Sequence, residues 1–161
     1  MNDKMIPSRE YWCFISYRHA DNKQSGRQWA TWLHVTLETY EVPIDLIGKQ
    51  NDRGDIIPDR IYPVFRDEEE LPADAALSKP IKQAVTNSKF MVVLCSPHAV
   101  VSRFVAEEIA LFKTHRPENK DRILAAIVAG DPAGEEVLDI KEISDIPYGH
   151  RQCFPRPLRF A

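Results

Sequence analysis

The sequence predicts an α/β protein, an open parallel β-sheet flanked by helices on both faces. Apolar runs at 11–17, 90–95 and 123–128 are too short for helices, and they alternate with segments of helical periodicity. These runs are apolar throughout rather than at every second position, which is typical of parallel strands with both faces buried. At 161 residues, the chain is long enough for one domain with a sizeable core.

The first half of the chain supplies two strands and one helix. The strand at 11–17 is followed by apolar side chains at helical spacing, which predict an amphipathic helix over 26–40: Trp29, Trp32, Leu33, Thr36, Leu37 and Tyr40. The segment 42–62 carries two prolines, two glycines and mixed charge, so we expect a long irregular connection. The apolar pattern resumes at 61–65, which predicts the second strand.

The second half continues the alternation of helix and strand. A helix is expected through Leu77, Ile81, Ala84 and Val85, and since Pro80 fits only a first turn, Ser78 or a neighbour caps it. Three further elements are predicted: a strand at 90–95, a helix at 101–113 and a strand at 123–128.

The apolar pattern fades after residue 130 into charged sequence that contains proline. We therefore divide the chain into a lead-in at 1–10, a domain at 11–145, and a tail at 146–161. An alternative interpretation of this tail is a linker to a domain outside this chain.

Composition narrows the classes of function. A net charge of -3 gives no electrostatic argument for nucleic acid or an anionic membrane. No apolar run approaches the length of about 20 residues that a membrane span needs, and the first residues lack a signal-peptide core. We therefore expect a cytoplasmic protein. The five histidines show no metal-ligand spacing, and no phosphate-binding glycine motif is present, so neither a metal site nor a cofactor is predicted.

One carboxylate stands out, because Glu108 falls within the apolar stripe of the helix predicted at 101–113. The rest of that stripe is apolar: Val101, Phe104, Val105, Ile109 and Phe112. An ionised carboxylate there costs several kcal/mol unless it is paired, hydrated or used. The preceding strand places it near the sheet's carboxyl edge, where open α/β sheets bind ligands. Glu108 is therefore a candidate site residue; the alternative is a buried acid paired with Ser16, Tyr17 or Ser96.

Three segments, in order, resemble the motifs of Toll/interleukin-1 receptor (TIR) domains of the bacterial type. Residues 14–21 read Phe-Ile-Ser-Tyr-Arg-His-Ala-Asp and resemble the first motif. Residues 64–67, Val-Phe-Arg-Asp, with 70–73, Glu-Leu-Pro-Ala, resemble the second motif and the start of the BB loop. Residues 90–97 and 102–109 resemble the third strand and the helix that follows it. The likeness covers roughly residues 11–130.

The resemblance implies a flavodoxin-like fold of about five parallel strands and one of two functions. Some members of the family only self-associate, whereas others cleave NAD⁺ at the nicotinamide–ribose bond with a glutamate on the helix after the third strand. That glutamate corresponds to Glu108, so NAD⁺ is the expected substrate. Phe104 stands where the enzymatic members usually carry tryptophan, and Asp74 stands where many carry glycine.

The same resemblance implies which other residues contact NAD⁺ or a second copy. The residues expected to bind NAD⁺ are Tyr17, Arg18, His19, Asp67, Leu71, Ser96 and Phe104. The expected BB-loop interface consists of Pro72, Ala73 and Asp74. Ordinary structural roles are open for several of them: Arg18 as an ion-pair partner of Asp67 or Glu70, His19 as a solvated loop residue, and Phe104 as core.

Nicotinamide leaves NAD⁺ as a neutral molecule, so the reaction needs no general acid, and one carboxylate can stabilise the cationic ribosyl centre. Water capture would give ADP-ribose, and internal capture would give a cyclic product. The expected function is thus NAD⁺ cleavage activated by TIR–TIR self-association, with antiphage defence and a sensor domain in a longer chain implied by the family. The alternative is a non-catalytic TIR–TIR interaction module. A third possibility, a nucleoside deoxyribosyltransferase-like enzyme, is disfavoured by the segment at 14–18.

Overall fold

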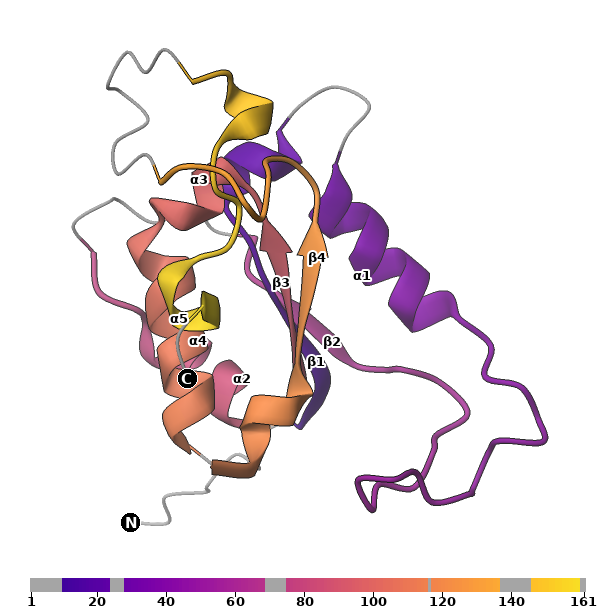
Figure 1. Ribbon diagram of the computed structural model, residues 1–161. Helices are drawn as coiled ribbons and strands as arrows, with labels where there is room; N and C mark the ends of the chain where they lie inside the picture. Colours follow the sequence, from indigo (N-terminus) through magenta and orange to yellow (C-terminus); the bar gives the residue numbers. More distant parts are fainter. Residues whose placement is uncertain (1–9, 24–27, 69–74, 116, 137–145, 160–161) are drawn as a thin grey trace, which may run out of the picture.

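The computed structural model describes residues 10–23, 28–68, 75–115, 117–136 and 146–159. Its centre is a parallel sheet in the order β2-β1-β3-β4 (Figure 1). The strands are β1 (Tyr11–Ser16), β2 (Val64–Arg66), β3 (Ser88–Cys95) and β4 (Ile123–Ile127). The predicted α/β class and parallel sheet are confirmed, with four strands in the described residues where about five were expected.

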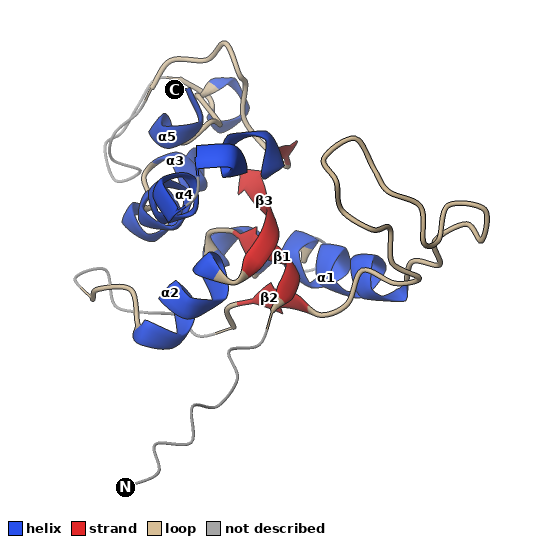
Figure 2. Cartoon of the chain, turned by 90° about the horizontal axis from the view of Figure 1, so that it is seen from below, coloured by secondary structure: helices blue, strands red, loops and turns tan. Residues whose placement is uncertain are grey.

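Helices cover the two faces of this sheet. The α-helices are α1 (Trp29–Thr39), α2 (Lys79–Thr86), α3 (Pro97–Val100), α4 (Arg103–His115) and α5 (Arg156–Arg159). The short 3₁₀ helices are η1 (His19–Asn22), η2 (Pro117–Arg122) and η3 (Tyr148–His150). Seen from below, α1 lies on one side of the strands, and α2 and α4 lie on the other (Figure 2).

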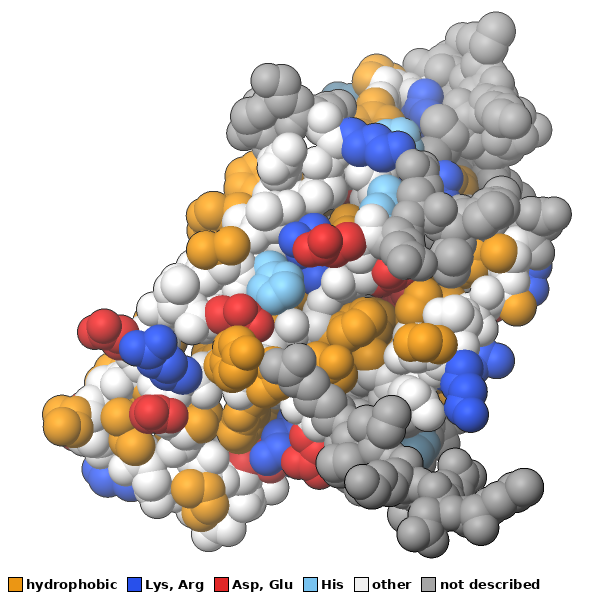
Figure 3. All heavy atoms as spheres, turned by 180° about the vertical axis from the view of Figure 1, so that it is seen from behind, with side chains coloured by type: hydrophobic (Ala, Val, Ile, Leu, Met, Phe, Trp, Pro, Cys, Tyr) orange, Lys and Arg blue, Asp and Glu red, His pale blue; other side chains and the backbone are white. Residues whose placement is uncertain are grey.

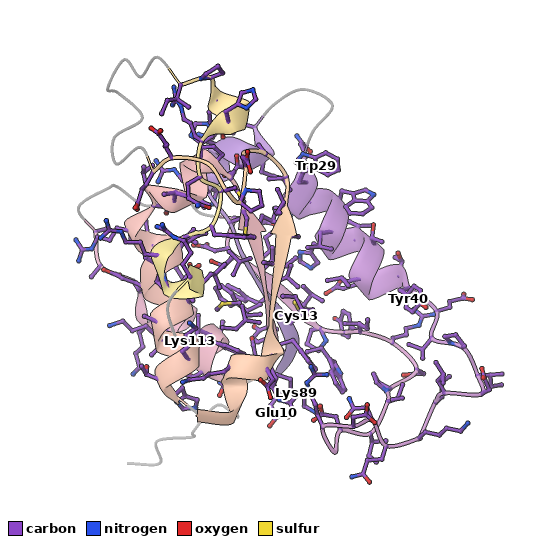
Figure 4. The ribbon with its side chains drawn as sticks, in the orientation of Figure 1. Glu10, Cys13, Trp29, Tyr40, Lys89 and Lys113 are labelled. Atoms are coloured by element: carbon purple, nitrogen blue, oxygen red, sulfur yellow. The ribbon has the colours of Figure 1, made fainter. Side chains whose placement is uncertain are left out.

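The central strands feed two separate cores because successive side chains of a strand point to opposite faces. On β1, Cys13 and Ile15 pack into the core under α1, whereas Phe14 packs into the core under α2 and α4. On β3, Val92 and Leu94 belong to the first core, and their neighbours belong to the second. Figure 4 shows Cys13 within the interior. The face to which a residue points is therefore set by its position along the strand.

Serine hydroxyls fix where the helices on the second face begin. Ser78 Oγ accepts a hydrogen bond from the backbone N–H of Ile81, as predicted for the start of α2. The helix predicted at 101–113 begins at Arg103 instead, because the chain first forms α3, which Ser96 caps. Ser102 Oγ then accepts from the backbone N–H of Val105 and caps α4.

Helix α1 forms as predicted, but it buries a different stripe from the one inferred. Ala30 is fully buried, and Leu33 and Leu37 pack against the same core. Trp32 is 58% exposed, and its ring meets that of Trp29 edge-on at 6.1 Å. Figure 4 labels Trp29 in the first turn of α1. The inferred stripe was wrong at its tryptophans because the small Ala30, rather than the large neighbouring rings, faces the sheet.

The segment 42–62 is irregular, as predicted, and extends away from the rest of the molecule on the α1 side (Figure 1). Hydrophobic, acidic and basic side chains are mixed on its surface (Figure 3). Its tip is closed by an antiparallel bridge between Gln50 and Ile56, with Gly54 at φ +85° in the turn. The second strand begins at Val64 rather than at 61 and has only three residues.

The chain after β4 returns to the sheet. Cys153 is fully buried in the core under α2 and α4, and α5 packs against α4. The return passes close to Gly130, where a Cβ would lie 2.8 Å from Cβ of Cys153. Residues 148–159, assigned to the tail or linker from sequence, thus include residues that pack on the domain; the proposed division of the chain stays a prediction.

Candidate active site

The order of the strands marks where a ligand site is expected. From β1 the chain moves outward to β2 and then returns to β3 on the other side of β1. In a parallel sheet, that reversal opens a crevice beyond the carboxyl ends of the two central strands. Ser16 ends β1 and Cys95 ends β3, so the crevice lies beside these residues.

Glu108 lies at this crevice. On α4 it belongs to a buried stripe with Val105, Ile109 and Phe112, at the spacing predicted from the sequence. Only 7% of Glu108 is exposed, and its Oε2 accepts a hydrogen bond of 2.5 Å from Ser16 Oγ. Ser16 follows Phe14 by two residues on β1, so both point toward α4. The buried acid is therefore paired, and its partner comes from the central strand.

The surroundings of Glu108 favour its neutral form. Burial raises the pKa of Glu108 to about 8, and the hydrogen bond from Ser16 opposes this rise. The negative charges of Asp67 and Glu107 raise the pKa further. A carboxyl group with so high a pKa at the carboxyl edge of a sheet is a candidate functional group, because perturbed acids concentrate at active sites.

A pocket opens in front of Glu108. It is lined by Ile15, Tyr17, Arg18, His19, Asp67, Leu77, Ile81, Ser102, Phe104 and Glu108. Its free space is about 30 Å³, enough for one or two water molecules. The structure thus brings together five of the residues that the resemblance assigned to NAD⁺ binding: Tyr17, Arg18, His19, Asp67 and Phe104.

The rim of the pocket is tied together by the backbone carbonyl of Asp67. The hydroxyl of Tyr17 donates to this oxygen at 2.5 Å, and Nε2 of His19 lies 3.1 Å from it. The Tyr17 and His19 rings pack against each other, with centroids 4.9 Å apart. These contacts join the loop after β1 to the loop after β2.

The remaining predicted site residues form two groups, Ser96 and the segment 71–74. Ser96 lies outside the pocket lining: its hydroxyl donates to Oδ2 of Asp21 at 2.5 Å and accepts from the backbone N–H of Ala99. Leu71, Pro72, Ala73 and Asp74 fall outside the described residues. Ser16, which the sequence offered only as a structural partner, contacts the key carboxylate directly. Its position two residues after a core phenylalanine was the available signal.

Within the described residues, no cluster of histidine, cysteine, aspartate and glutamate side chains has the makings of a metal site. The helices among those residues are also too short or too polar to cross a bilayer. All three cysteines are buried free thiols.

Comparison with protein families decides the relationship. The family model for the TIR domain matches residues 13–152, which include the pocket and all of the sheet except the first two residues of β1. The chain belongs to the TIR domain family. The parallel sheet and the helices that flank it are thus the fold of a TIR domain.

This TIR domain is similar to one curated protein and to one solved structure. A curated protein from Actinoplanes sp., named NAD(+) hydrolase ApTIR, is 32% identical over 100 residues. That match covers 59% of this chain but only 13% of the relative's length. A solved structure, the TIR domains of the activated Roq1 resistosome directly recognising the pathogen effector XopQ, aligns with a TM-score of 0.48 and 19% identity. It covers 77% of this chain and 61% of that chain.

Proposed function

We propose that this TIR domain cleaves NAD⁺ at the bond between nicotinamide and ribose, with Glu108 as the essential carboxylate. The observation that carries the proposal is the burial of Glu108 at the switch point of the sheet, in front of a pocket. A carboxyl group with a raised pKa at the ligand-binding edge of the sheet supports a functional role, because perturbed pKa values concentrate at active sites. The relative named NAD(+) hydrolase supports the same chemistry.

The pocket residues would divide the work as follows. Glu108 faces the ribose and stabilises the positive charge that develops there as nicotinamide leaves. Phe104, on the same helix, offers an aromatic face to the nicotinamide ring. Arg18 offers a guanidinium to the diphosphate.

The positive charge of the substrate affects the protonation of Glu108. The nicotinamide ring of NAD⁺ is positively charged, and a cation beside Glu108 favours its ionised form. Binding would thus lower the pKa of Glu108 and release its proton, generating the carboxylate that the reaction needs. Turnover at low substrate concentration is accordingly expected to rise with pH toward about 8, the pKa of Glu108 in the free protein.

The decisive measurement is nicotinamide release from concentrated protein in a crowding agent, with Glu108→Gln compared with wild type. We expect the substitution to reduce release by at least about 10²-fold, because an amide cannot supply the negative charge. Glu107→Gln is the matched control: it removes the same charge from the neighbouring position, where the side chain pairs with Arg103 at 2.6 Å. Equal release by wild type and Glu108→Gln would exclude Glu108 from the mechanism.

The second candidate is a TIR–TIR interaction module without turnover. It is favoured by an apolar groove between α1 and the edge of the sheet, lined by Trp29, Trp32, Leu33, Leu94, Ala126, Ile127 and Val128. Leu124 and Ile127 on β4 are 55% and 49% exposed. Absence of nicotinamide release from protein shown by light scattering to be assembled would favour this module over the enzyme.

The proposal also includes what the family implies about activation, product and biological role. Self-association would activate cleavage, hydrolysis or cyclisation would follow release, and a sensor elsewhere in a longer chain would trigger assembly during antiphage defence. Chromatography of the nucleotide product would distinguish ADP-ribose from a cyclic isomer.

A further inference from the structure

A hydrogen bond between two buried side chains, Ser16 and Glu108, joins the central strand β1 to α4. The two residues are separated by 92 positions, and their oxygens lie 2.5 Å apart. Ser16 is fully buried on the central strand, and Glu108 is buried on the helix that crosses it. Neither side chain can reorient without disturbing a packed element, so the bond holds a fixed geometry.

The bond engages one oxygen of the carboxyl group. Ser16 donates to Oε2, and Glu108 also contributes to the wall of the pocket. A carboxyl group anchored through one oxygen presents its other oxygen in a defined direction, whereas an unanchored one rotates about its terminal torsion, which is broad. Stabilising a developing charge requires a preorganised group, because reorientation during the reaction costs free energy.

We propose that Ser16 is a positioning residue for NAD⁺ cleavage, holding Oε2 of Glu108 so that Oε1 is aimed at the ribose. This inference rests on the proposed function of Glu108. Ser16 acts through the glutamate and is not itself assigned a contact with the reacting atoms. It adds a residue that neither the family resemblance nor the comparisons assign to the site.

The hydrogen bond also has an electrostatic effect. A donor to the carboxylate favours its ionised form, and this bond lowers the pKa of Glu108 against the effect of burial. The other groups that bear on Glu108 are Asp67 from the loop after β2 and Glu107 from α4, both of which raise its pKa. Tyr17, Arg18 and His19 line the same pocket from the loop after β1.

Ser16→Ala tests the proposal, with Ser88→Ala as the matched control. Ser88 is also buried on a central strand, but its hydroxyl donates to the carbonyl of Ala84 at 2.6 Å, and Ser88 does not line the pocket. In full-length assembled protein, Ser16→Ala should lower kcat for nicotinamide release by about tenfold or more with little change in KM. It should also move the acidic limb of the pH–rate profile upward by about one unit. Ser88→Ala should leave both unchanged.

Direct titration of the Glu108 carboxyl by carbon-13 NMR, without NAD⁺, separates this inference from the proposed function. A rise in the pKa of Glu108 in Ser16→Ala supports the contact between the two residues. If wild type releases no nicotinamide, the proposed NAD⁺ cleavage is overturned, and with it the positioning role of Ser16. An unchanged titration, or an unchanged kcat and pH profile, overturns the inference alone. Should Ser16→Ala fail to fold, Ser16→Cys keeps a weaker donor, and an intermediate shift is expected; no shift would again overturn it.

Discussion

The buried carboxyl group of Glu108 makes the stability of the folded protein depend on pH. Its pKa of about 8 in the folded protein exceeds the ordinary value of 4.5, so the folded state holds a proton that the unfolded chain releases. Between these two pH values the unfolded chain binds fewer protons, and the free energy of unfolding falls as pH rises. The full stability is present below about pH 4.5 and the loss is complete above about pH 8.

Glu108→Gln should therefore stabilise the protein at alkaline pH. The amide keeps an oxygen that accepts from Ser16 but does not ionise, so the variant avoids the burial of a charge. We expect it to match wild type near pH 5 and to exceed it by roughly 2–4 kcal/mol at pH 8.5. Urea unfolding at the two pH values measures this difference. A gap that is independent of pH would show that Glu108 does not titrate across this range.

The sequence pattern identifies some residues of the candidate site and not others. Glu108 could be identified because a charged residue in an apolar stripe is a visible conflict with helical periodicity. Ser16 could be named only as one of three possible partners of Glu108, because a small polar residue at the end of a strand is common and the two residues lie 92 positions apart. Ser96 had the same appearance, yet it bonds to Asp21 on η1.

At the level of elements, periodicity located every described strand and the helices α1, α2 and α4. Where it failed, side-chain size and capping decided the outcome. Ala30 rather than Trp32 faces the sheet, and Ser102 delays the start of α4. The exposure of Leu124 on β4 could not be foreseen either, because an apolar run gives no sign that a strand lies at an edge.

An ion pair with Arg122, the last residue of η2, ties the irregular segment 42–62 to the chain next to β4. Arg122 donates to both carboxylate oxygens of Asp55, at 2.7 and 3.2 Å, and lies 5.0 Å from the centroid of the Phe90 ring. Asp55→Asn should weaken this anchor by about 1–2 kcal/mol, because both partners are largely buried. Hydrogen exchange should then quicken within residues 42–62. Asp59→Asn serves as the control.

The anchor at Asp55 also predicts a dependence on acidity. Arg122 holds the pKa of Asp55 below its ordinary value, so the pairing contributes stability above that value and is lost as pH falls through the lowered pKa. Protection factors within the segment, which correct for the slower intrinsic exchange in acid, should fall in wild type at acidic pH and fall less in Asp55→Asn. An equal fall in both proteins would assign the effect to another group.

For the whole molecule, the approach of the C-terminal segment to the end of the sheet depends on Gly130. This residue adopts φ +88°, and a Cβ there would lie 2.9 Å from the carbonyl oxygen of Arg151 as well as close to Cys153. Gly130→Ala combines backbone strain with overpacking and should cost roughly 2–4 kcal/mol. Gly149→Ala is the control, since its Cβ would meet nothing within 4 Å. Thermal unfolding of the two variants tests the difference; equal melting temperatures would contradict it.

The alternation of β1 has a consequence for how this domain tolerates changes in length. Ser16 and Tyr17 are neighbours in sequence, yet one bonds to Glu108 and the other packs with the core under α1 while its hydroxyl reaches Asp67. An insertion or deletion of one residue within β1 would exchange these duties and also send Phe14 to the wrong core. The packing of both cores and the contact to Glu108 therefore depend on the same register of β1. Substitutions can change the site, whereas a shift of β1 by one residue would disrupt it together with the fold.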